Sequence, residues 1–240
     1  MGYNIAQIGV IHSCYKEKFG IPRQPGLASF AQGVVELLPE YGCAESVRGL
    51  EAFSHIWLLF LFHQVPLGQW KPTVRPPRLG GNQRMGVYST RSPYRPNHIG
   101  MSVVALERIE VIEGKVSLQV SGLDLVEGTP IIDIKPYLGY VDSIEAAQGG
   151  FASTVPEQKL RVRFSPLARQ QCQDLSSDYP HLLSLIEQIL ALDPRPAYTD
   201  GCNNEKVYGM RLYDFDLKWQ VSSEGVWVTE LSRIEPNCTV

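Results

Sequence analysis

Residues 101–126 read MSVVALERIEVIEGKVSLQVSGLDLV, two strand-like runs joined at Glu113-Gly114. Short apolar and β-branched runs separated by a glycine-containing turn are typical of antiparallel strands. Helical periodicity is largely absent before about residue 150. Further strand-like runs lie on both sides, at 4–13, 33–38, 55–63, 85–90 and 130–137, and Glu127-Gly128 is another turn. Many short strands at modest spacing predict a barrel or a sandwich rather than an alternating β-α-β sheet.

The sequence changes character after AAQGGFAS, residues 146–153. Ser165 and Pro166 predict a helix with a serine cap and proline at its first position. PHLLSLIEQILALD (180–193) predicts a second helix that ends at DPRP (193–196), because proline disfavours helical geometry in the preceding residue. YDFDLKWQV (213–221) alternates between apolar and polar residues, as a half-buried strand does. We therefore expect a mainly β protein, with a barrel-like domain over residues 1–150 and a smaller α+β domain over residues 151–240.

The composition limits the possible environments and partners. A net charge of −3 gives no general attraction to nucleic acids or acidic membranes, so an anionic ligand needs a local patch. The five cysteines are scattered and form no C-x-x-C pair, which argues against a disulfide framework and a zinc site. The most apolar segment, FSHIWLLFLFH, is too short to span a bilayer. No export signal is evident, so we expect a cytoplasmic protein.

A local cationic patch is present between Ala52 and Leu106. This segment contains no Asp or Glu and leaves a charge of −9 for the rest of the chain. Its cations are Lys71, Arg75, Arg78, Arg84, Arg91 and Arg95. Arginine presents a planar fork suited to carboxylates and phosphates, and the prolines at 72, 76, 77, 93 and 96 fix the backbone that carries these side chains. The pattern predicts a rigid anion site, although each arginine taken alone is better explained as loop surface.

Common catalytic and nucleotide-binding motifs are missing. The sequence contains no G-x-G-x-x-G after a strand, no G-K-[ST] and no H-E-x-x-H, and LGGNQRMG (79–86) is only weakly similar to a phosphate loop. Metal-dependent hydrolysis is therefore not supported.

Several motifs occur together and in order: PRQPG (22–26), RGLEAFSHIWLLFLFH (48–63), RPPRLGGNQRMGVYSTRSPYRPNHIG (75–100), VEGTPIIDIKPY (126–137) and DPRPAY (193–198). Together they resemble the tRNA N6-threonylcarbamoyladenosine methyltransferase family, the TrmO or YaeB/TsaA-like proteins, over nearly the whole chain. One departure is His98, where the family usually has proline in R-P-N-P-I-G. We expect this change to loosen the turn.

The resemblance implies a dimeric, S-adenosylmethionine-dependent enzyme built on a small β-barrel, with the cofactor near the subunit interface. Its reaction would add a methyl group to N6 of N6-threonylcarbamoyladenosine, beside the tRNA anticodon. The family's cofactor residues match Gln24, Pro25, Gly26, His63, Gln64, Arg91, Met101, Glu127, Gly128, Thr129 and Pro130. Arg91 suits the cofactor carboxylate, whereas the glycines and His63 also fit ordinary turn and barrel-rim positions.

A general base would help the carbamoylated N–H to react, and we expect it among His63, Asp133 and Tyr198. Asp133 shares a strand face with Lys135 and Tyr137, so a cross-strand ion pair is an equal alternative for its carboxylate. Arg84 or Arg95 would bind the threonyl carboxylate of the base. The anticodon-stem phosphates would meet Lys71, Arg75 and Arg78, and Arg195 is a further tRNA contact or simply part of a helix stop.

Two other functions remain open at this point. The same patch would suit a non-catalytic RNA-binding barrel that does not bind S-adenosylmethionine. A methyltransferase of this fold acting on a small molecule would use a different pocket shaped by the C-terminal domain.

Overall fold

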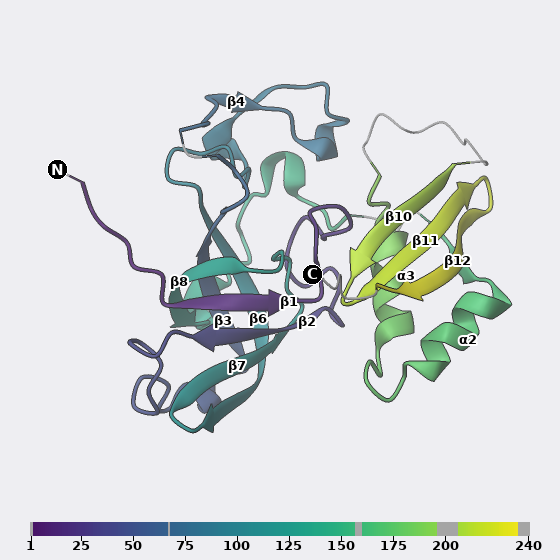
Figure 1. Ribbon diagram of the computed structural model, residues 1–240. Coiled ribbons are helices and arrows are strands. Elements are labelled where there is room, and N and C mark those ends of the chain that lie inside the picture. Colours follow the sequence, from purple (N-terminus) through teal and green to yellow (C-terminus); the bar gives the residue numbers. More distant parts are fainter. Residues whose placement is uncertain (1, 67, 157–159, 196–205, 235–240) are drawn as a thin grey trace.

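The computed structural model describes residues 2–66, 68–156, 160–195 and 206–234. Figure 1 shows a β-barrel beside a smaller sheet that carries two helices. The predicted class, a small barrel followed by an α+β unit, is confirmed.

The barrel closes in the order β1-β2-β7-β6-β3-β8, and every neighbouring pair is antiparallel. Its strands are β1 (Gly9–Ser13), β2 (Gln32–Leu37), β3 (His55–Leu61), β6 (Ile99–Ile112), β7 (Lys115–Ser121) and β8 (Thr129–Pro136). Glu113 and Gly114 both take positive φ, 51° and 78°, in the predicted turn between β6 and β7. This geometry matches the right-handed twist of the paired strands.

The long strand β6 allows the barrel to close. Its first half pairs with β3 and its second half with β7, and the register shifts between Leu106 and Arg108. A bulge bends a strand, which lets one strand turn the corner between two neighbours. Alternate residues fill the interior, among them Ile56 and Leu58 of β3 and Val116 and Leu118 of β7.

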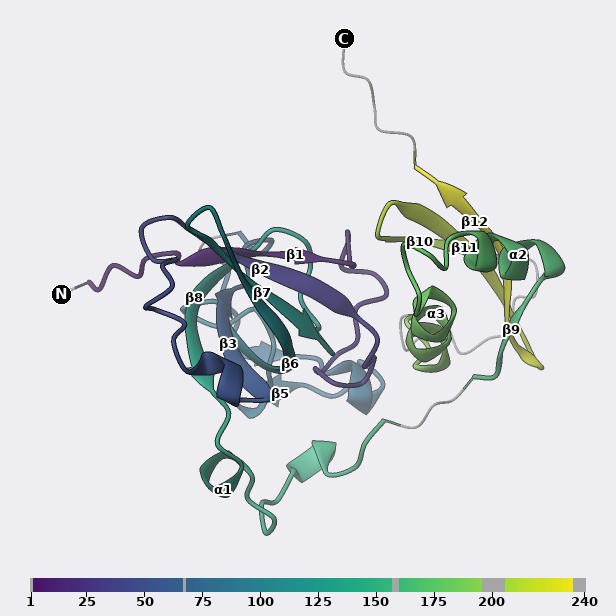
Figure 2. The same ribbon diagram turned by 90° about the horizontal axis from the view of Figure 1, so that it is seen from below.

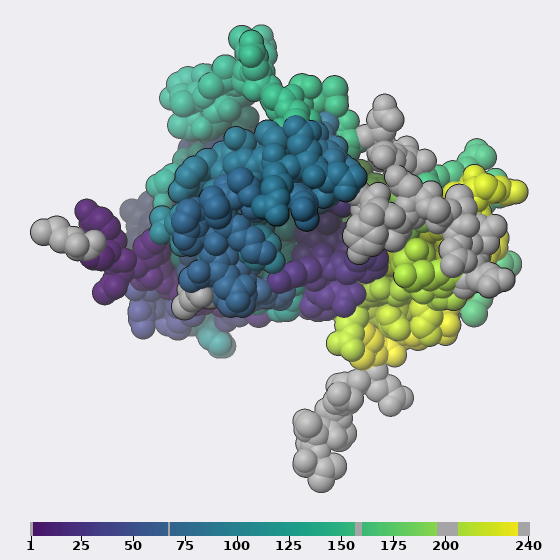
Figure 3. All heavy atoms as spheres, turned by 90° about the horizontal axis from the view of Figure 1, so that it is seen from above, coloured from purple at the N-terminus to yellow at the C-terminus, as the bar shows by residue number. Residues whose placement is uncertain are grey.

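Residues 68–98 carry all six cations of the patch, and this basic segment lies outside the barrel wall. It contains β4 (Thr73–Val74) paired with β5 (Met85–Gly86), and the 3-10 turns η2 (Pro77–Leu79) and η3 (Val87–Ser89). MGVYST, which we expected to be one strand, therefore forms a two-residue strand followed by a 3-10 turn. In Figure 3 this blue segment forms a raised surface over the barrel.

The linking segment leaves β8 and runs along one side of the molecule (Figure 2). It includes α1 (Gly139–Asp142) and η4 (Gly150–Ala152), while η1 (Leu50–Ala52) precedes β3.

The C-terminal sheet has the order β10-β11-β12-β9. Its strands are β9 (Val162–Phe164), β10 (Val207–Leu212), β11 (Phe215–Ser222) and β12 (Gly225–Arg233), and its helices are α2 (Pro166–Asp174) and α3 (Leu182–Ala191). Ser165 caps α2 by accepting a hydrogen bond from Ala168 N, as predicted. The expected alternation of β11 is confirmed, with Phe215, Leu217, Trp219 and Val221 buried.

The two units pack against each other through a continuous core. Tyr213 N donates to Cys14 O at 2.7 Å, and the rings of Phe30 and His181 stack at 4.8 Å. Gln188 of α3 donates to Ser29 Oγ and accepts from Phe30 N. These contacts fix the segment between β1 and β2, which carries Gln24, Pro25 and Gly26.

Candidate cofactor and tRNA site

The expected cofactor segments gather at one end of the barrel because neighbouring strands are antiparallel. The end of β1 lies beside the start of β8, where Ile11 pairs with Thr129. The end of β3 lies beside the start of β6, where Leu61 pairs with Ile99, and the end of β7 lies beside the start of β2, where Ser121 pairs with Gln32. This barrel mouth therefore brings together the loops at 14–31, 62–98 and 122–128.

Arg91 and Gln24 meet at the mouth although 67 residues separate them. Arg91 Nη1 donates to Gln24 Oε1 at 2.7 Å, and the arginine is otherwise exposed. Gly26, with φ of 78°, donates its N–H to Gly122 O at 2.8 Å. No atom lies within 4 Å of where a Cβ on Gly26 would stand, so its backbone is open to close approach.

Asp124 is a mouth residue that the sequence analysis did not single out. Ser102 Oγ donates to Asp124 Oδ1 at 2.6 Å, and Ser102 is buried inside the barrel. Burial raises the pKa of Asp124 to about 6, although the Ser102 hydrogen bond and the nearby charge of Arg91 act in the opposite direction. Asp124 is thus a largely buried carboxylate on which the charge of Arg91 acts.

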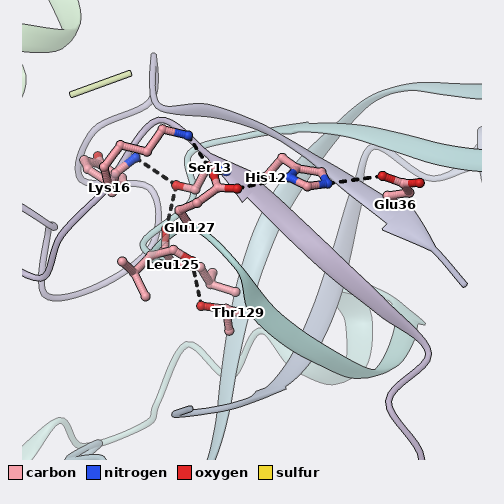
Figure 4. A network of polar contacts seen from close by, with 9 residues as sticks. His12, Ser13, Lys16, Glu36, Leu125, Glu127 and Thr129 are labelled. Carbon is pink, nitrogen blue, oxygen red and sulfur yellow. Dashed lines mark hydrogen bonds and ion pairs between the residues drawn. The ribbon is translucent and has the colours of Figure 1, made fainter. Parts of the chain in front are cut away.

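The Glu127 carboxylate binds protein groups at the end of β1 (Figure 4). It accepts from Ser13 N at 2.7 Å and Lys16 Nζ at 2.9 Å, and it contacts His12 Nδ1 at 3.0 Å. Burial alone would raise the pKa of Glu127, but the hydrogen bonds from Lys16, His12 and Ser13 lower it overall. Its carboxylate holds β1 to the loop before β8.

The next three residues combine an open backbone with satisfied side chains. Gly128 takes φ of 74°, and nothing lies within 4 Å of its missing Cβ. The buried Thr129 donates its hydroxyl to Val126 O at 2.7 Å (Figure 4), and Pro130 pairs with Val10. A ligand here would meet backbone groups of Glu127–Gly128 more readily than the Thr129 hydroxyl.

His63 and Gln64 follow the end of β3 at the mouth, and both are exposed. Burial and the charge of Lys18 lower the pKa of His63, so its imidazole is neutral near pH 7. Lys18 Nζ donates to Gln64 O at 3.1 Å. Met101, opposite Leu59 in the β3–β6 ladder, is 47% exposed on the outer face of the barrel.

Of the other base candidates, Asp133 forms an ion pair with Lys135 at 2.8 Å and accepts from Ile134 N at 2.9 Å. The carboxylate is thus paired along its own strand, and not across strands as in the alternative that we gave. Tyr198 lies outside the described residues.

In the part of the chain that the structure describes, the cations of the basic segment are not paired with acidic side chains. Within the described residues, none of its six cations forms an ion pair with a carboxylate. Lys71 Nζ lies 4.5 Å from the centre of the Tyr94 ring, and Arg78 Nη2 donates to Thr154 Oγ1 at 2.9 Å. Arg84 has a long hydrogen bond to Thr73 Oγ1 at 3.3 Å, and Arg75 is exposed.

Arg95 and Arg195 are held more firmly than the exposed arginines. Arg95 Nη2 donates to the carbonyls of Val87 and Thr90 at 3.3 and 2.8 Å, which fixes the loop around η3. Arg195 is 9% exposed, and both oxygens of Asp193 bind its guanidinium at 2.7 and 2.8 Å.

His98 differs from the loosened turn that we expected. It takes φ of 49°, its N–H donates to Arg95 O at 3.3 Å, and its carbonyl accepts from Phe62 N at 2.8 Å. Proline has φ near −65° and no N–H, so it could form neither this conformation nor the bond to Arg95. The ring is buried at 5% exposure, and its Nε2 has no hydrogen-bond partner among the described residues.

The described residues contain no group of His, Cys, Asp or Glu that could hold a metal ion. Cys14, Cys43 and Cys172, the described cysteines, are free thiols. In the described part of the chain, every helix is too short or too polar to cross a membrane.

Asp124 and Ser102 were missed because they belong to unremarkable strand-like sequence. Their side chains meet only after β6 pairs with β7. A usable signal was present, since the polar Ser102 and Asp124 interrupt otherwise apolar runs.

Comparison with known proteins shows the family of the chain. Residues 10–143 match the model described as tRNA-methyltransferase O N-terminal domain, and residues 157–234 match that of the TrmO C-terminal domain. A relative from Escherichia coli (strain K12), named tRNA (adenine(37)-N6)-methyltransferase, is 48% identical over 234 residues, 98% of each chain.

Two further comparisons involve Pseudomonas aeruginosa. A relative from strain PAO1, named putative S-adenosylmethionine-dependent methyltransferase RcsF, is 47% identical over 91% of this chain and 93% of its own length. The crystal structure of TrmO from Pseudomonas aeruginosa matches with a TM-score of 0.80 and 40% identity, covering 97% of this chain and 99% of the other. Since both family models together span the barrel and the C-terminal sheet, the chain belongs to the tRNA-methyltransferase O family.

Proposed function

We propose that the chain transfers a methyl group from S-adenosylmethionine to N6 of N6-threonylcarbamoyladenosine at position 37 of tRNA. The observation that carries this proposal is the meeting of Arg91, Gln24, Gly26 and Gly128 at a barrel mouth beside an acid-free cationic surface. The relative named tRNA (adenine(37)-N6)-methyltransferase, 48% identical over the full chain, supports the reaction class.

The mouth residues fit S-adenosylmethionine. The exposed Arg91 fork suits its carboxylate, and the open backbone at Gly26 and Gly128 allows the flat adenine and the ribose to come close. The bound cofactor supplies an electrophilic methyl group on a sulfonium, which needs no further activation. The protein therefore aligns the nucleophile with that methyl group and excludes water.

Among the base candidates, His63 has the better protonation state for accepting the proton of the carbamoylated N–H. Its lowered pKa leaves it neutral, whereas Asp133 is held by Lys135. His63→Ala should lower kcat by roughly a hundredfold, the usual contribution of a general base, and Asp133→Asn should lower it less.

For the threonyl carboxylate of the base, Arg84 is a better candidate than Arg95. Arg95 already donates to two backbone carbonyls, whereas the contact of Arg84 to Thr73 Oγ1 is long. Arg84→Ala should therefore reduce the preference for tRNA that carries the threonylcarbamoyl group, more than it reduces affinity for tRNA in general.

The exposed Lys71, Arg75 and Arg78 would bind phosphates of the anticodon stem. The logarithm of the binding constant should then fall with the logarithm of salt concentration, with a slope of about −0.7 to −0.9 per phosphate contact. We also propose that the unit after residue 150 assists tRNA binding. Arg195 is already paired with Asp193, so it would contribute by shaping the surface rather than as a free cation.

We further propose a cytoplasmic homodimer. Outward-facing side chains of β3 and β6 form an apolar strip on the barrel that includes Trp57, Leu59, Leu61 and Met101. Such a strip beside the mouth fits a subunit interface. Light scattering of the purified protein tests this, and Met101→Glu should shift the mass toward the monomer.

Mass spectrometry of tRNA tests the reaction directly. The protein is incubated with S-adenosylmethionine and tRNA that carries or lacks the threonylcarbamoyl group, and one added methyl is expected only in the first case. Arg91→Ala should abolish methylation while tRNA binding is retained. Arg48→Ala, whose guanidinium is exposed with a long 3.9 Å contact to Glu45, is the matched control. Equal methylation of both tRNAs would contradict the proposed substrate.

A further inference from the structure

Asp124 is a charged group at the barrel mouth with no assigned task. Its Oδ1 accepts the Ser102 hydroxyl at 2.6 Å, and no other described residue donates a side-chain hydrogen bond to the carboxylate. Among the described atoms that are buried and lack a partner, neither Asp124 oxygen occurs. The second oxygen therefore keeps some contact with solvent and has no side-chain partner among the described residues.

Asp124 is also close to the proposed cofactor-binding loops. Gly122, two residues earlier, accepts the hydrogen bond of Gly26 N at 2.8 Å. The Arg91 charge acts on Asp124, yet the two form no ion pair within the described chain. A cation and an anion thus lie at one mouth without neutralising each other.

Keeping such a carboxylate ionised has a cost, because burial favours the neutral form. A ligand cation would offset this cost. An α-amino acid carries a carboxylate and an ammonium on the same carbon, and its two charges match Arg91 and Asp124. The ammonium offers three N–H donors, whereas a sulfonium offers none.

We propose that Asp124 recognises the α-ammonium of the cofactor's methionine moiety, while Arg91 takes its carboxylate. The inference rests on the proposed function and adds to it a second, anionic half of the amino-acid subsite. Ser102 then acts as a positioning residue that orients the carboxylate.

Calorimetry with product-like ligands tests the assignment without turnover. S-adenosylhomocysteine carries the amino-acid part, and 5′-methylthioadenosine lacks it. Asp124→Asn should lower the affinity for S-adenosylhomocysteine by roughly ten- to a hundredfold, as expected for the loss of a charged hydrogen bond. Its affinity for 5′-methylthioadenosine should change by less than about twofold. Asp174→Asn, on the surface of α2, makes the same charge change far from the mouth and should bind like the wild type.

A second measurement needs no variant. Decarboxylated S-adenosylhomocysteine is a thioether like 5′-methylthioadenosine, keeps the amine and lacks the carboxylate, so the wild type should bind it about tenfold more tightly than 5′-methylthioadenosine. Equal affinity of the wild type for these two ligands would overturn the assignment. So would an Asp124→Asn variant whose affinities for S-adenosylhomocysteine and 5′-methylthioadenosine fall by the same factor. If the wild type binds none of these ligands, the proposed function fails as well.

Discussion

Asp124→Asn should stabilise the protein above pH 6 even though it weakens cofactor binding. The folded-state pKa of Asp124 is about 6, against the usual 3.8. Each pKa unit corresponds to 1.36 kcal/mol, so the ionised carboxylate costs up to about 3 kcal/mol of folding free energy. Asparagine keeps an oxygen that can accept the Ser102 hydroxyl, and it removes the charge.

The sign of the pH dependence follows from linkage. Because the folded state holds the Asp124 proton more tightly than the unfolded state, this group lowers stability as pH rises from about 4 through about 6. The free energy of unfolding of Asp124→Asn minus that of the wild type should therefore be near zero at pH 4. It should grow to about 1–3 kcal/mol at pH 7.5.

Urea unfolding followed by tryptophan fluorescence measures this difference at pH 4.5, 6.0 and 7.5. Subtracting the wild-type curve removes the contributions of all other titrating groups. Asp174→Asn should show no such growth with pH, since its side chain is exposed. A difference that is independent of pH, or an Asp124→Asn variant that is less stable at pH 7.5, would refute the reasoning.

Three further changes test the fold. Ser165→Ala should lower the free energy of unfolding by about 1 kcal/mol, because it removes the cap of α2, and Ser165→Thr should restore most of it; equal losses in both would exclude capping as the cause. Gly100→Ala should lower the free energy of unfolding by about 1–3 kcal/mol, since its Cβ would lie 2.4 Å from the Phe60 ring. The control is Gly139→Ala, whose Cβ meets open space, and it should leave thermal unfolding almost unchanged. Hydrogen bonding to Glu127 raises the pKa of His12, so this pair should stabilise the fold below pH 6.5 and lose that effect as pH rises through the raised pKa. The effect is a few tenths of a kcal/mol for this exposed group, and a pH–stability curve unchanged by His12→Gln would contradict it.

Local patterns in the sequence determined most of the secondary structure. Alternation in 213–221 predicted the buried face of β11, and Ser165-Pro166 predicted the start of α2, because both depend on residues a few positions apart. The Glu113-Gly114 turn was readable for the same reason. The segment 85–90 was misread as a strand, since its extended part pairs only with Thr73–Val74 and then stops.

Tertiary structure decided which side chains share the site. Arg91 meets Gln24 across 67 residues, and Ser102 meets Asp124 across 22, only because the antiparallel strands bring alternate loops to one end of the closed barrel. The fold also gives similar arginines different roles. Arg95 donates hydrogen bonds to backbone carbonyls, whereas Arg91 and Arg84 remain accessible. Composition located the cations in the sequence, but strand pairing and desolvation determine which of them a ligand can reach.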